Sequence, residues 1–131
     1  MVSDIFLSVV IPSFDEMANL QKGVLDKVDA FLQRKKISFE VLVVDDGSKD
    51  GSVEFVDKFV SDHKNFRLIK NSHMGKAGAV TSGMLEARGK YRLFTDMDQA
   101  TPIEQVNALL PHFEEGYKVV IGSRSTKREG A

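Results

Sequence analysis

The chain has 131 residues, 42% of them hydrophobic and 28% charged, and its formal net charge is −1. These values predict one soluble globular domain and give no electrostatic reason to expect a nucleic-acid partner. The absence of cysteine excludes disulfides and thiolate metal sites, and no apolar run approaches the ~20 residues of a membrane-spanning helix.

Short apolar runs alternate with amphipathic stretches along the chain. In chain order, the pattern predicts a strand over residues 7–11, a helix from 16 to about 35, a strand over 39–44, a helix over 52–63, a strand over 66–69, a helix over 76–88, a strand over 91–95, a helix over 102–115 and a strand over 117–121. Gly89 is expected to end the third helix as a left-handed cap. Thr101, Pro102 and Glu104 are the residue types of an N-cap, a first-turn proline and a capping box, which mark the start of the last helix.

This alternation predicts an α/β fold, with a mostly parallel, Rossmann-like sheet wound by right-handed crossovers and helices on both faces. In such sheets, ligands bind beyond the carboxyl ends of the strands. Polar side chains follow every predicted strand, at residues 15–16, 45–46, 71–76, 96–98 and 123–124. We therefore expect a binding site along this edge of the sheet.

The loop after the fourth predicted strand carries Asp96 and Asp98, one residue apart. Like charges at this spacing repel each other, whereas two carboxylates offer the hard oxygen ligands that a divalent cation prefers. An isolated pair of this kind is usually two solvated loop residues. Its position after a buried strand, together with a second aspartate pair upstream, favours a cation site here.

Asp45 and Asp46 end the second predicted strand and are followed by Gly47 and Ser48. This pattern fits a turn with local hydrogen bonds. It also fits a carboxylate that accepts a hydrogen bond from the N–H of a nucleobase. The residues alone leave both interpretations open.

Three other loops carry weaker signals. Residues 12–16 fit a turn before a helix, or the wall of a nucleotide pocket in which Phe14 faces a base. Gly75 and Lys76 begin a predicted helix whose backbone N–H groups suit a phosphate. Their segment lacks the glycine spacing of the phosphate-binding loop of nucleotide hydrolases. We expect His73, which precedes them, to be a surface histidine. Arg124 fits either a phosphate contact or the exposed basic segment 124–128.

Taken in order, five segments resemble the inverting family-2 glycosyltransferases. They are residues 9–16 (VVIPSFDE), 43–48 (VVDDGS), 75–80 (GKAGAV), 94–98 (FTDMD) and 120–124 (VIGSR). The resemblance is strongest to the branch that transfers glucose or mannose to dolichyl or polyprenyl phosphate. Asp15 departs from it, because asparagine is common there, and so does Ala100, where some mannosyltransferases have a metal-binding glutamine. The Thr101–Pro102 pair and segment 75–80 are more similar to the glucosyl branch.

The resemblance implies a GT-A type nucleotide-sugar-binding fold and a role for each matching residue. For the nucleoside, Pro12, Phe14 and Glu16 would line the pocket, and Asp46 with Asp45 would hold the base. Near the sugar and phosphates, Lys76 would lie close to the donor and Asp96 would contact the ribose or the metal. Asp98 would bind Mg²⁺ or Mn²⁺, and Arg124 would contact a phosphate. The implied reaction transfers a hexose, glucose rather than mannose, from a UDP-glucose or GDP-mannose type of donor to a polyprenyl or dolichyl phosphate at a membrane surface, with inversion. Asp96, Asp98 and Arg124 would be the catalytic residues.

Members of this family are longer than the present chain. We therefore expect residues 1–131 to form a single nucleotide-sugar-binding part, with the acceptor-binding part absent and with weak turnover by this part alone. The same resemblance places the longer parent protein in the cytoplasm, at the cytoplasmic face of a membrane.

Other classes of protein fit the pattern less well. A response-regulator receiver normally has its acidic pair after the first strand and a lysine after the last, where this chain has Arg124. A haloacid-dehalogenase-type phosphatase would use Asp96 and Asp98 but has Thr or Val at the position of Ala100. A dinucleotide oxidoreductase would need a Gly-x-Gly-x-x-Gly motif, which is absent. A fragment that binds a nucleotide without catalysis remains an alternative.

Overall fold

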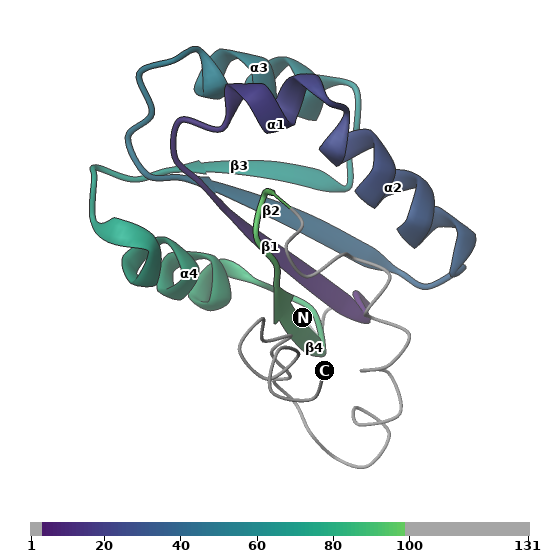
Figure 1. Ribbon diagram of the computed structural model, residues 1–131. Coiled ribbons are helices and arrows are strands. Elements are labelled where there is room, and N and C mark those ends of the chain that lie inside the picture. Colours follow the sequence, from purple (N-terminus) through teal and green to yellow (C-terminus); the bar gives the residue numbers. More distant parts are fainter. Residues whose placement is uncertain (1–3, 99–131) are drawn as a thin grey trace, which may run out of the picture.

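Four parallel strands form the sheet of the computed structural model, which describes residues 4–98 (Figure 1). The strands are β1 (Leu7–Ser13), β2 (Phe39–Asp45), β3 (Phe66–Lys70) and β4 (Tyr91–Phe94). Their order across the sheet is β3-β2-β1-β4. The chain therefore builds the sheet outward from β1 to β3 and then returns to the other side of β1. The carboxyl ends of β1 and β4 flank the point where the strand order reverses, which is where open α/β sheets bind ligands.

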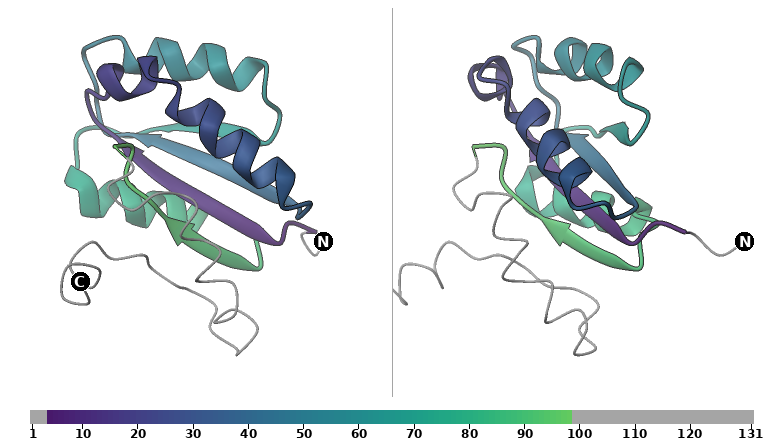
Figure 2. Two further views of the ribbon diagram at one scale, coloured as in Figure 1. Left: turned by 45° about the vertical axis from the view of Figure 1, so that its right-hand side comes forward. Right: turned by 90° about the vertical axis from the view of Figure 1, so that its right-hand side faces the viewer.

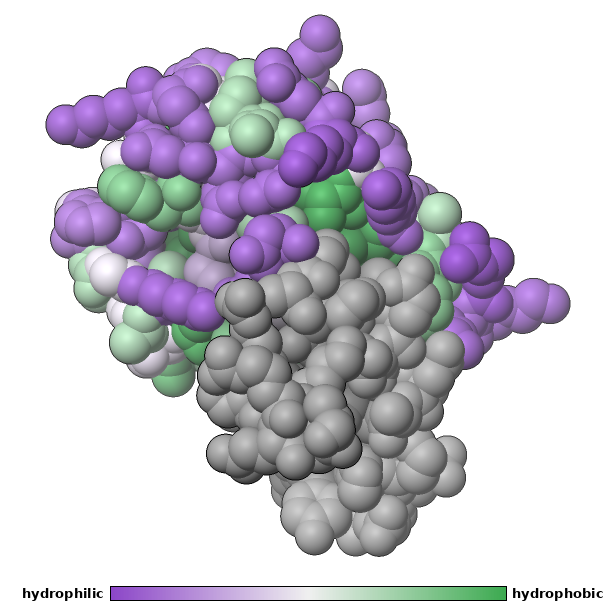
Figure 3. Space-filling model, in the orientation of Figure 1, coloured by the Kyte–Doolittle hydropathy of each residue, from purple (hydrophilic) through white to green (hydrophobic). Residues whose placement is uncertain are grey.

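Helices cover both faces of the sheet, as predicted. Helices α1 (Met17–Gln21), α2 (Val24–Arg34) and α3 (Ser52–Ser61) lie on one face, and α4 (Gly75–Glu86) lies on the other (Figures 1 and 2). Hydrophilic side chains cover most of the outer surface of α1 and α3 in Figure 3, as expected of helices that bury only one side. Within residues 4–98, no helix has the length and apolar composition needed to cross a membrane.

The alternation of side chains along β1 separates two cores. Val9 and Ile11 pack in the larger cluster, which includes Val28 of α2. Val10 faces the other way and packs against Ala79 of α4. Every residue of β1 and β2 is buried, which explains why these strands are mostly apolar rather than alternating between apolar and polar residues.

Every strand and helix predicted within the described residues is present, but the first predicted helix is wrong in form. Residues 16–35 fold as two helices, because the chain breaks at Gly23, whose φ is +82°. This left-handed conformation suits glycine, and it lets α2 start in a new direction after α1 (Figure 1). The predicted helix over 102–115 and strand over 117–121 lie outside the described residues.

The prediction for Gly89 is also wrong. Helix α4 ends at Glu86 and continues into extended backbone at Ala87, and Gly89 is not among the glycines with positive φ. Glycine at this position lets the backbone approach β1 closely. The N–H of Gly89 donates to Ser8 Oγ at 2.8 Å, and a Cβ at this position would lie 2.6 Å from the same oxygen.

A buried acidic residue, Glu40, joins the strands near the opposite, amino-terminal edge of the sheet. The Glu40 carboxylate accepts hydrogen bonds from the Ser8 hydroxyl at 2.6 Å, from the Arg88 N–H at 2.6 Å and from the Arg67 guanidinium at 3.3 Å. These bonds tie β1, β2 and β3 to the segment that leads into β4. The carboxylate of Glu40 is thus used in internal hydrogen bonds that join the strands at the amino edge.

Candidate functional site

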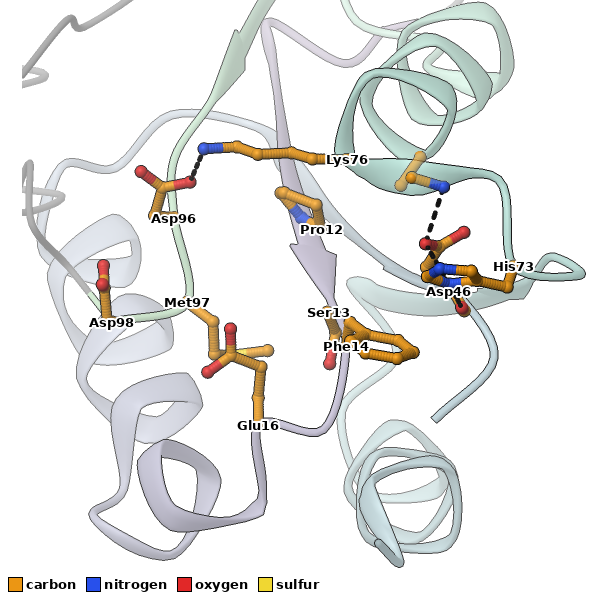
Figure 4. Close-up of a pocket in the computed structure, with 12 residues that line it drawn as sticks. Pro12, Ser13, Phe14, Glu16, Asp46, His73, Lys76, Asp96, Met97 and Asp98 are labelled. Carbon is orange, nitrogen blue, oxygen red and sulfur yellow. Dashed lines mark hydrogen bonds and ion pairs between the residues drawn. The ribbon is translucent and has the colours of Figure 1, made fainter. Parts of the chain in front are cut away.

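A pocket of about 360 Å³ opens at the carboxyl ends of β1 and β4 (Figure 4). Its lining comes from the end of β1, from the segments that follow β1, β2, β3 and β4, and from the first two turns of α4. The lining residues are Pro12, Ser13, Phe14, Glu16, Asp46, His73, Gly75, Lys76, Ala79, Asp96, Met97 and Asp98. The volume falls within the ~300–1,000 Å³ that is usual for small-molecule sites.

The loops after β1 and β2 are joined by hydrogen bonds. Asp15, which adopts a left-handed φ of 51°, donates its N–H to Ser48 Oγ at 2.8 Å and accepts from the Lys49 N–H at 2.9 Å. Asp50 accepts from the Ser52 hydroxyl and from the Met17 N–H, which begins α1. The hydrogen bond from Ser52, followed by those from Met17 and Ser52 N–H groups, lowers the pKa of Asp50. Phe14 and Glu16 therefore project from a loop that is braced by its neighbour.

The two adjacent aspartates after β2 have different surroundings. The Asp45 carboxylate accepts hydrogen bonds from the N–H groups of Gly47 and Ser48 at 3.0 and 2.9 Å and from the Ser48 hydroxyl at 2.6 Å. These are the bonds of a local turn, and Asp45 is not among the pocket residues. Asp46 does line the pocket, and its carboxylate accepts from the N–H groups of Met74 and Gly75 at 2.6 and 2.9 Å.

His73 lies in the pocket between Asp46 and Phe14 (Figure 4). Its Nδ1 is 3.0 Å from Asp46 Oδ2, and its ring centroid is 4.7 Å from that of Phe14, with 38° between the planes. The sequence indicated a surface histidine, and the side chain is indeed 65% exposed. The sequence missed its place in the pocket, and the available signal was its position in the loop just before Gly75 and Lys76.

The opposite end of the pocket is charged. Lys76, in the first turn of α4, places its Nζ 2.6 Å from Asp96 Oδ1 (Figure 4). Met97, between the two aspartates, is only 1% exposed and packs in the larger core. Anchoring of Met97 fixes the loop, while Asp96 and Asp98 on either side of it line the pocket.

Asp96 and Asp98 match the donor chemistry of Mg²⁺ or Mn²⁺. Carboxylate oxygens are hard ligands, and Mg²⁺ is usually held by one or two carboxylates together with substrate phosphates and water. Within residues 4–98, no group of three or more acidic, histidine or cysteine side chains is arranged to hold a metal ion. A cation at this end of the pocket would therefore depend on oxygen atoms of a ligand as well as on these two carboxylates.

The structure thus brings most of the predicted site residues together. Those that line the one pocket are Pro12, Phe14, Glu16, Asp46, Lys76, Asp96 and Asp98. The structure does not bring Asp45 to the pocket, because its carboxylate is engaged by the turn. Arg124 lies outside the described residues. The roles of all these residues in binding and catalysis remain predictions.

Comparison with known proteins gives a consistent match. The family described as Glycosyl transferase family 2 matches residues 8–130. The chain is 36% identical to a dolichyl-phosphate beta-glucosyltransferase of Dictyostelium discoideum, over 95% of this chain and 41% of the relative. It is 37% identical to a dolichyl-phosphate beta-glucosyltransferase of Saccharomyces cerevisiae, over 82% of this chain and 34% of the relative. The chain therefore spans less than half the length of these two relatives.

Among solved structures, the mannosyltransferase PcManGT from Pyrobaculum calidifontis, solved in complex with GDP-Man and Mn²⁺, superimposes with a TM-score of 0.60. The sequences are 25% identical, and the match covers 82% of this chain and 33% of that chain. This similarity confirms that the sheet and helices described above form part of a GT-A type fold.

Proposed function

The chain belongs to glycosyltransferase family 2, and on this premise we propose that it binds a nucleoside diphosphate hexose for transfer to a dolichyl or polyprenyl phosphate. The transfer would depend on Mg²⁺ or Mn²⁺ and invert the anomeric carbon. Because the chain spans less than half of its relatives, the activity, substrates and partners of the whole protein are all part of this proposal. The family match leaves the receiver and phosphatase hypotheses without support.

The observation that carries the proposal is the division of one pocket into an aromatic end and a charged end. Phe14 and His73 offer ring faces, which suit a nucleobase. Lys76, Asp96 and Asp98 offer one cation and two hard anionic ligands, which suit a diphosphate bound with a divalent ion. A nucleoside diphosphate has these two kinds of group at its two ends.

Each charged residue has a distinct proposed task in transfer. A cation held by Asp96 and Asp98 would act as a Lewis acid that neutralises the charge developing on the leaving diphosphate. Lys76 would turn from Asp96 toward the phosphates and add fixed positive charge near them. Arg124 would contact a phosphate of the donor or of the acceptor.

A lipid-phosphate acceptor would need no general base from the protein. A phosphate monoester has a second pKa of about 6 and is already largely a dianion near neutral pH, so its oxygen can attack without losing a proton to the protein. A sugar hydroxyl, in contrast, would need a positioned carboxylate base. A lipid phosphate is therefore the acceptor class that fits best.

Glucose is the proposed sugar. It is favoured over mannose because both relatives above are named as dolichyl-phosphate beta-glucosyltransferases. The dolichyl phosphate in those names also supports a site of action at a membrane surface, which we propose is the cytoplasmic face.

Calorimetry tests the donor assignment. Residues 1–131 are titrated with UDP-glucose and GDP-mannose, with and without Mn²⁺, using both wild type and Asp98→Ala. We expect tighter binding of UDP-glucose when Mn²⁺ is present, and loss of that gain in Asp98→Ala, because one of two metal ligands is gone. Asp57→Ala, which removes an exposed carboxylate of α3 outside the pocket, serves as the matched control. Equal wild-type affinity with and without Mn²⁺ would retire the metal claim.

A further inference from the structure

The Nδ1 atom of His73 is held by Asp46, while the side chain as a whole is 65% exposed. Its Nδ1 lies 3.0 Å from Oδ2 and 3.1 Å from the main-chain oxygen of Asp46. Both of these atoms are acceptors, so Nδ1 must carry the hydrogen. In a neutral imidazole the other nitrogen, Nε2, then has a lone pair and can only accept a hydrogen bond.

The carboxylate of Asp46 has little capacity left for a ligand. It accepts from the N–H groups of Met74 and Gly75 as well as facing His73, and the side chain is only 4% exposed. The His73 side chain, in contrast, is 65% exposed and lies beside the Asp46 carboxylate at the same end of the pocket (Figure 4). A base that enters this end of the pocket therefore meets the imidazole before it meets the carboxylate.

Phe14 completes a place for a flat ring. Its side chain is 46% exposed in the pocket, and its ring lies against that of His73. Aromatic faces attract a nucleobase without regard to its identity, because every base has a similar face. Discrimination between bases has to come from a polar atom at the edge of the ring.

We propose that His73 selects the nucleobase by accepting a hydrogen bond at Nε2 from a ring N–H, with Asp46 holding the imidazole in the required tautomer. This inference rests on the proposed nucleotide-binding function. Uracil and guanine carry such a ring N–H, whereas cytosine and adenine present an unprotonated nitrogen at the corresponding position. The site would thus bind UDP or GDP more tightly than CDP or ADP.

Binding of free nucleotides tests the proposal. UDP, GDP, CDP and ADP are titrated at pH 8 with Mn²⁺ into residues 1–131 and into His73→Phe, which keeps a ring beside Phe14 but has no nitrogen. We expect wild type to bind UDP or GDP about fivefold or more tightly than CDP or ADP. UDP and GDP gain a hydrogen bond to Nε2, whereas in CDP and ADP an unprotonated ring nitrogen would face Nε2, and neither atom could donate. In His73→Phe, the ratio of the affinity for UDP or GDP to the affinity for CDP or ADP should fall close to one.

A second histidine supplies the matched control. His63 also stacks on a phenylalanine, Phe59, and also engages a main-chain oxygen through Nδ1, but it lies outside the pocket. His63→Phe should therefore keep the wild-type preference. The ¹⁵N signals of the histidine rings give a readout that needs no variant: UDP or GDP should shift Nε2 of His73 and leave His63 unchanged.

The outcomes separate the two proposals. If no nucleotide binds to wild type, the proposed function fails and this inference fails with it. If nucleotides bind but the preference persists in His73→Phe, or the Nε2 signal of His73 does not respond, the selection by His73 is wrong while the nucleotide site stands.

Discussion

Asp50 shows how a single carboxylate outside the pocket supports the residues inside it. It accepts hydrogen bonds from Ser52 and from the N–H of Met17, which begins the helix after the Phe14 loop. Its pKa is lowered, first by the Ser52 hydroxyl. The ionised form is thus favoured in the folded protein, and the loop that carries Phe14 and Glu16 depends on that charge.

The sign of the pH effect follows from this pKa. A carboxyl whose folded pKa lies below its unfolded value stabilises the fold above the unfolded pKa and loses that contribution as the pH falls through the folded pKa. We expect Asp50→Asn to lower the free energy of unfolding at pH 7. The difference from wild type should shrink as the pH falls below 3.8, the ordinary value for this group.

Urea denaturation at pH 7 and at pH 3 measures this difference, with the exposed Asp57→Asn as the control. A difference that is the same at both pH values would show that the charge of Asp50 contributes nothing.

At the scale of elements, α4 carries Gly75 and Lys76 to the pocket, and Gly83 sets how closely this helix approaches the sheet. A Cβ on Gly83 would lie 2.3 Å from Val10 Cγ1 and 3.0 Å from Val44 Cγ2. The helix can therefore pack directly on β1 and β2 only if this position has no side chain.

We expect Gly83→Ala to destabilise the protein, because the strain of overpacking, about 1–3 kcal/mol, exceeds the gain of up to about 1 kcal/mol in helix propensity. Thermal unfolding measures the effect. Leu85→Ala on the same helix, where the side chain is 78% exposed, should leave the melting temperature nearly unchanged. A Gly83→Ala protein that melts at or above wild type would refute the close packing described here.

The elements also show which features a sequence can predict. Largely apolar runs such as 39–44 predict buried strands, because burial on both faces leaves few polar positions. Gly23 and Gly89 have the same residue type, yet one breaks a helix and the other permits contact with Ser8, and only tertiary structure separates these roles. Periodicity over 16–35 hid the break because the apolar spacing continues through it.

Some residues of the candidate site could also be predicted from the sequence, and others could not. Acidic residues at strand ends predicted Asp45, Asp46, Asp96 and Asp98 as site residues, because a parallel sheet brings such ends to one edge. The sequence could not distinguish Asp45 from Asp46, since the direction of each carboxylate depends on the loop that donates to it. It missed His73 for the same reason: nothing in a loop sequence shows that a histidine will be held by an aspartate 27 positions away.

At the scale of the whole molecule, the two edges of the sheet differ in their polar side chains. At the amino edge, the Glu40 carboxylate accepts hydrogen bonds from Ser8, Arg88 and Arg67, and these bonds join three strands. At the carboxyl edge, the loops leave a pocket with an aromatic end and a charged end. A divalent ion bound with a nucleotide should therefore act at one edge only, next to Asp96 and Asp98.

Paramagnetic broadening by Mn²⁺ locates the ion most directly. In ¹⁵N-labelled protein with UDP and a small fraction of Mn²⁺, the amide signals of residues 96–98 should broaden first, followed by those of Lys76 and the Phe14 loop. The signals of Glu40 and Arg88 should stay sharp. Broadening centred on the amino edge, or no UDP-dependent broadening at residues 96–98, would contradict the account.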